Sequence, residues 1–120
     1  MENQETVWQQ YVVYLLLMLL MFIAGTSFGQ IEVTHFNAGW NSNNDVPWIM
    51  DLKDCKSMGY TDIAKNPDIA KEHKIAVVPT IIVFKDGEEV ARFQADLSFK
   101  MVATREEVQE EISNIIMSDF

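Results

Sequence analysis

The sequence is poor in cysteine and in positive charge. One cysteine in 120 residues excludes an internal disulfide, a Cys-x-x-Cys redox pair and the cysteine-rich zinc sites. Only 9 Lys and Arg stand against 18 Asp and Glu, for a formal net charge of −9. Nucleic acid is therefore disfavoured as a partner, because phosphate binding requires clustered cations. The two histidines lie far apart in the chain, so we expect no metal site, and no motif indicates a cofactor.

Charge is missing altogether from one stretch near the N-terminus. No charged residue occurs from Thr6 to Ile31, and Tyr11–Ala24 is an uninterrupted apolar run of 14 residues. That length matches the core of a signal peptide, about 7–15 residues, better than a membrane span, which needs about 20. Ser27 and Gly29 have the small-x-small spacing that a signal peptidase recognises, with cleavage before Gln30.

The flanks of this run leave a second interpretation open. The residues before it are acidic and lack Lys and Arg, whereas signal peptides usually begin with basic residues. We predict that residues 1–29 form a hydrophobic helix that acts as a signal peptide or as a membrane anchor. In the second case the chain would touch the membrane only through residues 7–29. A third interpretation is a helix buried in the domain, but this is disfavoured because the run is apolar on every face. The protein is expected to be exported, in a periplasmic or extracytoplasmic space, or anchored in the membrane.

Residues 30–120 are long enough for one folded domain. Hydrophobic alternation, Asn, Pro and Gly positions and a Thr-x-x-Glu capping box predict the order β-α-β-α-β-β-α. Such an order favours an α/β fold with a mixed four-stranded sheet flanked by helices. The predicted strands cover residues 31–37, 56–63, 77–84 and 89–93. The first predicted helix covers residues 45–54 and is capped by Asn44 or Asp45. The second starts at Asn66-Pro67, and the third starts at Thr104.

Three pieces of this domain resemble thioredoxin. The first strand runs into Ala38-x-Trp40, Asn66-Pro67 precedes Pro79-Thr80 by twelve residues, and Ile81–Arg92 is similar to the thioredoxin hairpin. The resemblance covers about residues 38–117 and implies a thioredoxin-like fold with a cis bond between Val78 and Pro79.

The same resemblance shows where the chain departs from thioredoxin. Asn41, Ser42, Asn43 and Asn44 follow Trp40, where thioredoxins have Cys-x-x-Cys. Disulfide exchange needs a low-pKa thiolate and a resolving thiol, and an asparagine amide supplies neither. We therefore predict a redox-inactive domain with no catalytic residue.

The expected function is binding of a polypeptide or partner protein in a groove beside the cis-proline. A backbone that does not close the sheet ladder before such a proline is free to pair with an extended chain. The predicted binding residues are Trp40, Asn41, Ser42, Asn43, Asn44, Val78, Pro79 and Thr80.

Two other functions remain open at this stage. The chain could be a thiol-disulfide oxidoreductase of the thioredoxin family that acts through Cys55 with an external thiol. Cys55 lies eleven or more residues beyond the positions of the missing cysteines, and a lone cysteine is usually a small half-buried hydrophobe. The chain could also be a structural module of an envelope complex.

Overall fold

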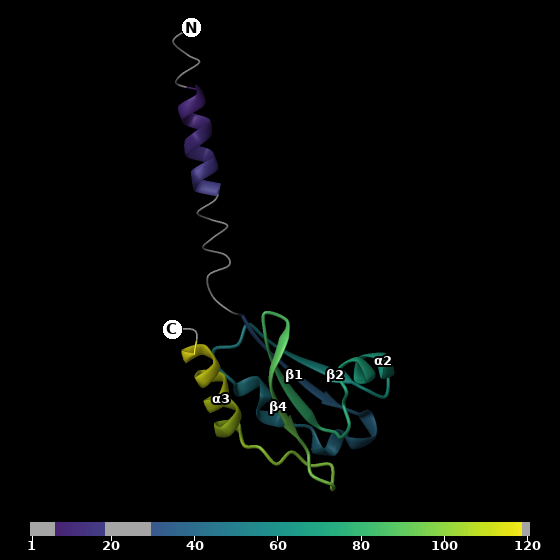
Figure 1. Ribbon diagram of the computed structural model, residues 1–120. Helices are drawn as coiled ribbons and strands as arrows, with labels where there is room; N and C mark the ends of the chain where they lie inside the picture. The colour runs from purple at the N-terminus through teal and green to yellow at the C-terminus, as the bar shows by residue number, and fades with distance from the viewer. Residues whose placement is uncertain (1–6, 19–29, 119–120) are drawn as a thin grey trace.

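The computed structural model describes residues 7–18 and 30–118. A four-stranded sheet forms the centre, with strand order β2-β1-β3-β4 (Figure 1). The strands are β1 (Ile31–Asn37), β2 (Ser57–Asp62), β3 (Thr80–Lys85) and β4 (Glu88–Gln94). β2 runs parallel to β1, whereas β3 is antiparallel to both β1 and β4. The predicted α/β fold and mixed sheet are confirmed.

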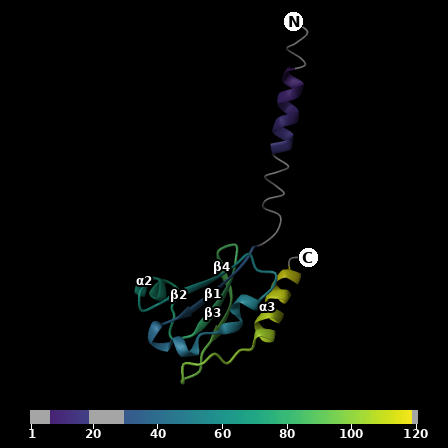
Figure 2. The same ribbon diagram turned by 180° about the vertical axis from the view of Figure 1, so that it is seen from behind.

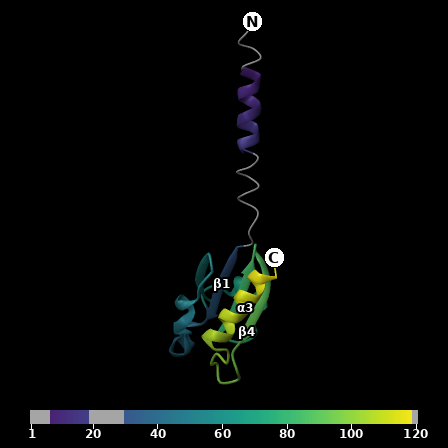
Figure 3. The ribbon, with the colours of Figure 1, turned by 90° about the vertical axis from the view of Figure 1, so that its left-hand side faces the viewer.

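The two faces of the sheet are covered by different helices. The 3₁₀ helix η2 (Pro47–Asp51) and α3 (Arg105–Met117) cover one face, where α3 lies across the sheet as Figure 3 shows. The principal core lies there, built from alternate residues of the central strands with apolar residues of both helices. These are Ile31, Val33, Val46, Ile49, Leu52, Ile81, Val83, Val108 and Ile112.

The short helix α2 (Pro67–Glu72) lies on the far side of the sheet from α3 (Figure 2). His73 follows it and contacts the rings of Phe36 and Phe84, with centroids 5.5 Å away in each case. Arg92 of β4 donates hydrogen bonds to the carbonyl oxygen of His73, at 2.6 Å, and to that of Lys74, at 3.0 Å. The end of α2 is thereby fixed to the sheet.

The predicted helix over residues 45–54 is wrong. Within this range the structure has the short 3₁₀ helix η2, which begins after Val46, and a second 3₁₀ helix, η1 (Gly39–Asn44), precedes the range. Val46 is extended, with φ −86° and ψ 103°, because a residue before proline is kept out of the helical region. No side chain caps η2, so Asn44 and Asp45 do not have the capping role that was predicted.

The other boundaries agree with prediction to within a few residues. β3 starts at Thr80 rather than at residue 77, because Pro79 has no N–H for the ladder. Asn66 occupies the N-cap of α2, but its side chain donates to the carbonyl oxygen of Asp62 at 2.9 Å instead of capping the helix. Thr104 caps α3, accepting from the Glu107 N–H at 3.2 Å.

Residues 7–18 form a helix, as predicted for part of the apolar run. Its apolar side chains are exposed on every side, with Trp8 at 73 % and Leu15 at 66 %. Within the described ranges, no helix combines the length and apolar character required to span a bilayer. The apolar residues 19–24 and the small residues Ser27 and Gly29 lie outside the described residues, so the signal-peptide and membrane-anchor interpretations stay predictions.

Candidate functional site

The residues predicted to form a site meet at the end of β1. This strand ends at Asn37, and Ala38 leads directly into η1. The register between β1 and β3 pairs Phe36 with Thr80, so the start of β3 lies beside the start of η1. The Val78–Pro79 bond is cis, as predicted.

Asn41 is the centre of this junction. It is 5 % exposed, and its amide nitrogen donates to Oδ1 of Asn37 at 3.0 Å and to the carbonyl oxygen of Phe99 at 3.1 Å. A longer contact of 3.5 Å reaches the carbonyl oxygen of Val78. In return, Nδ2 of Asn37 donates to the Asn41 carbonyl at 3.1 Å. One amide therefore joins β1, the residue before the cis-proline and the loop after β4.

Neighbouring polar side chains complete an asparagine network around Asn41. Nδ2 of Asn44 donates to Oδ1 of Asn41 at 2.8 Å, and Nδ2 of Asn37 donates to Oδ1 of Asp45. In the described part of the chain, no buried side-chain nitrogen or oxygen lacks a hydrogen-bond partner. Buried polar groups cost free energy unless they are paired, and here the pairing is complete. Asn41 and Asn44, which the resemblance aligns with the thioredoxin cysteines, thus connect segments of the fold through their hydrogen bonds.

Trp40 lies on the surface of the same junction. Its side chain is 66 % exposed, and its ring meets that of Phe99 edge to face, with centroids 5.3 Å apart. Phe99 belongs to a loop that is closed at its base by a bridge between Ala95 and Met101. Leu97, in the same loop, is 95 % exposed. We call Trp40, Leu97 and Phe99 the Trp40 surface.

The structure divides the predicted binding residues into two layers. Trp40, Ser42 and Asn43 are exposed, and Asn44 is half-buried. The others are buried beneath them: Asn41, Val78, Pro79 and Thr80. Sequence reasoning missed Leu97 and Phe99, although two large apolar residues in an otherwise polar loop are a signal that could have indicated them.

Cys55 is far from this junction. It precedes β2, and the N–H of Lys56 donates to the carbonyl oxygen of Ile31 at 2.7 Å, so Cys55 lies where β1 begins. The length of β1 separates it from Asn41 by roughly 20 Å. The thiol is half-buried against the core, and burial, followed by the Asp54 carboxylate, raises its pKa. A raised thiol pKa lowers the thiolate fraction and with it the nucleophilicity at neutral pH.

His35 is the buried titratable group nearest to the junction. It is 4 % exposed, its Nε2 accepts from the Val46 N–H at 3.4 Å, and Tyr60 meets its ring edge to face at 5.3 Å. Burial lowers the pKa of His35, and the Asp45 carboxylate opposes that shift in part. A small hollow of about 220 Å³ lies against these residues, with Met50 and Met58 in its wall.

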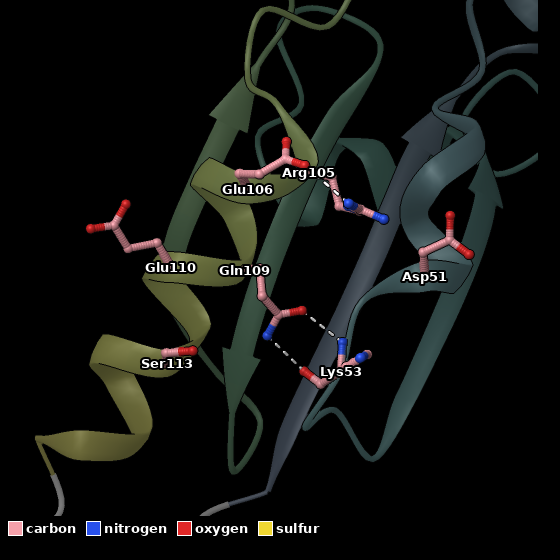
Figure 4. Close-up of a pocket in the computed structure, with 7 residues that line it drawn as sticks. All are labelled: Asp51, Lys53, Arg105, Glu106, Gln109, Glu110 and Ser113. Carbon is pink, nitrogen blue, oxygen red and sulfur yellow. Dashed lines mark hydrogen bonds and ion pairs between the residues drawn. The ribbon is translucent and has the colours of Figure 1, made fainter.

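A larger hollow of about 400 Å³ lies between α3 and the segment after η2 (Figure 4). The Gln109 side chain bridges it, accepting from the Lys53 N–H at 2.7 Å and donating to the Lys53 carbonyl at 3.0 Å. Its wall carries charges of both signs, with Arg105 paired to Glu106 at 3.0 Å. The lining of this hollow therefore does not favour a ligand of either charge. Among residues 7–18 and 30–118, no group of three His, Cys, Asp or Glu side chains is placed to hold a metal ion.

Comparison with known proteins supports the fold and a distant relationship to thioredoxins. No protein-family model matches the chain. Thioredoxin Y1 of Arabidopsis thaliana, a chloroplastic protein, is 43 % identical over 54 residues, which are 45 % of this chain and 31 % of that protein. The match thus spans about a third of the relative's length.

Solved thioredoxin structures have the same fold at low identity. A Schistosoma mansoni thioredoxin has a TM-score of 0.57 at 21 % identity, covering 82 % of this chain and 87 % of that one. A mutant thioredoxin from Halobacterium salinarum also has a TM-score of 0.57, at 18 % identity, covering 72 % and 75 %. This protein is therefore a thioredoxin-like domain with a single cysteine and no Cys-x-x-Cys pair.

Proposed function

We propose that this thioredoxin-like domain is redox-inactive and binds an extended segment of a polypeptide at the Trp40 surface. The observation that carries the proposal is the exposure of Trp40, Leu97 and Phe99 beside the cis-proline. Trp40 and Phe99 are in contact, and Leu97 belongs to the same loop as Phe99. Large exposed apolar side chains of neighbouring segments mark an interaction surface, and aromatic residues contribute most to binding at such surfaces.

The asparagine network supports this surface from below. Asn41 holds the loop of Phe99 through the Phe99 carbonyl, and Phe99 in turn contacts the Trp40 ring. Because the network is closed, both aromatic rings are held before a ligand arrives, and preorganisation lowers the entropy cost of binding. The residues predicted to bind thus act in two ways: Trp40, Ser42 and Asn43 contact the ligand, and the buried residues position them.

The test is binding of an unfolded probe, reduced carboxymethylated α-lactalbumin, followed by fluorescence anisotropy. The full chain should bind it, and Trp40→Ala and Phe99→Ala should each raise the dissociation constant roughly tenfold or more. Val90→Ala is the matched control, since Val90 is an exposed apolar residue (42 %) on β4. No binding by the wild type, or an equal loss with Val90→Ala, would overturn the proposal.

We also propose that the N-terminal apolar segment brings the chain to a membrane, as a cleaved signal or as a retained anchor. The absence of charge from Thr6 to Ile31 and the exposed apolar side chains of the helix over residues 7–18 support this. The intact mass of the protein isolated from cells distinguishes the two forms: a chain that starts at Gln30 indicates cleavage. A full-length chain that stays in the soluble fraction and does not float with phosphatidylcholine vesicles would contradict both.

A further inference from the structure

β2 presents an unpaired strand edge in the described part of the chain. It is the first strand in the order β2-β1-β3-β4, so it has a neighbour on one side only. The Ile63 N–H donates to the Asn37 carbonyl at 2.9 Å, which directs this residue toward β1. Backbone groups of alternate residues point to the same side, so those of Met58, Tyr60 and Asp62 point away from β1. An edge of this kind pairs with another extended backbone.

The usual protections of such an edge are weak here. β2 contains no proline and no lysine, and residues that are exposed or half-exposed run along its whole length. Tyr60 is 51 % exposed, and the nearby Met50 side chain is 70 % exposed. Natural edge strands are usually blunted by Lys, Pro or a covering loop. The β2 edge is therefore open to pairing with an extended chain.

The sequence of this edge is complementary to itself. When two copies run antiparallel, with Gly59 opposite Gly59, Lys56 of each copy, the residue just before β2, comes to the end of the interface where Asp62 of the other copy lies. The Lys56 N–H is bonded to the Ile31 carbonyl of β1, so Lys56 would contribute its long side chain and no ladder hydrogen bond. The same register pairs Met58 with Tyr60 twice, and a thioether against an aromatic ring is a favourable contact. It also brings the outward-pointing backbone groups of both copies together, because Met58 and Tyr60 both direct theirs away from β1.

We infer that a second copy of this chain is the occupant of the β2 edge, forming a two-fold symmetric dimer with an eight-stranded sheet. Two Lys56–Asp62 ion pairs fix the register at the ends. Lys56 is exposed, and its ammonium group donates to Oε1 of Gln30 at 2.8 Å, a surface contact that leaves its charge available. The Gly59 pair at the centre has no side chains to separate the two backbones.

Covalent trapping tests this register in the full chain. A Gly59→Cys substitution in a Cys55→Ser background places two thiols on the two-fold axis. Opposed residues in a non-hydrogen-bonded antiparallel pair have Cα atoms about 4.5 Å apart, within the roughly 4.4–6.8 Å that a disulfide spans. We expect rapid formation of a covalent dimer under mild oxidation in detergent. Val90→Cys in the same background is the control, because Val90 lies on β4 at the other edge of the sheet.

Charge reversal makes the test specific to this interface. Lys56→Glu in the Gly59→Cys background should slow cross-linking roughly tenfold, because it replaces two attractions by two repulsions. Adding Asp62→Lys should restore the original rate. Association through the apolar N-terminal helix would affect the Gly59 and Val90 variants alike. Equal cross-linking of those two variants, or a charge-reversed pair that fails to restore the rate, would overturn the inference without affecting the proposal for Trp40.

Discussion

The two ends of β1 carry the two kinds of group that could give this domain a function, and they differ in what surrounds them. At the end of the strand, buried asparagines hold exposed aromatic rings beside a cis-proline. At its start, Cys55 is half-buried, and its thiol donates to the Lys53 carbonyl at 3.4 Å. The exposed aromatic rings and the cis-proline therefore lie at one end of β1, where the resemblance aligns Asn41 and Asn44 with the thioredoxin cysteines, whereas the one cysteine of the sequence lies at the other end.

Of the substitutions at the two ends of β1, Asn41→Ala should lower the free energy of unfolding most. Asn41→Ala leaves the Asn37 and Asn44 side chains and the Phe99 carbonyl without their shared partner. Each buried polar group left unpaired costs about 1–3 kcal/mol, so we expect the free energy of unfolding to fall by about 3 kcal/mol. Urea denaturation measures this loss. The exposed Asn43→Ala is the control and should stay within about 0.5 kcal/mol of the wild type; equal effects would mean that the network contributes nothing.

The dependence of stability on pH tests the burial of His35 near the same end. Burial lowers the pKa of folded His35, whereas the unfolded chain has the ordinary value of about 6.5. The unfolded state therefore binds the proton first. The contribution of neutral, buried His35 to the free energy of unfolding is complete above pH 6.5. It falls as the pH drops below that value, by at most about 1.4 kcal/mol per pH unit.

Urea denaturation between about pH 5 and 7 checks this expectation, since most carboxylates stay ionised in that range. His35→Gln removes the titrating ring and should lose this part of the slope. If His35→Gln kept the wild-type dependence of unfolding free energy on pH, that dependence would belong to another titrating group.

Cys55 should be a slow nucleophile. Its raised pKa leaves little thiolate at pH 7, so alkylation by iodoacetamide should run roughly tenfold slower than for free cysteine and accelerate as the pH rises. Mass spectrometry follows the reaction. Insulin reduction with dithiothreitol should match the protein-free control. If the wild type reduced insulin and Cys55→Ser did not, the active group would lie at the start of β1.

Trp40→Ala should have the smallest effect on stability. The ring is 66 % exposed and loses chiefly its edge-to-face contact with Phe99. We expect the free energy of unfolding to change by less than about 1 kcal/mol. Together with weaker binding of the unfolded probe, this would separate Trp40, a contact residue, from Asn41, a positioning residue. A large loss of stability would instead place Trp40 in the fold.

The sequence predicted which residues meet at the end of β1 better than it predicted the local structure between them. The resemblance to thioredoxin implied that Trp40, Asn41 and a cis Pro79 lie near one another, and the structure brings them together where η1 and β3 begin. The helix expected over residues 45–54 was wrong, since its apolar spacing fits a helix but Pro47 forces Val46 into an extended conformation. Asn41 and Asn44 were expected to face a ligand groove; the structure buries the first and half-buries the second.

The sequence by itself determined the strand pattern and the lack of a dithiol, because these depend on neighbouring residues or on composition, and its resemblance to thioredoxin indicated the cis bond before Pro79. Tertiary structure alone decided that Asn41 lies beneath the surface and that Phe99, 58 residues later, lies over it. It also decided that Cys55 lies at the opposite end of β1. These arrangements depend on strand register and on hydrogen bonds between distant segments, and the amide of Asn41 has no preferred partner until the sheet brings β1 and the loop after β4 together.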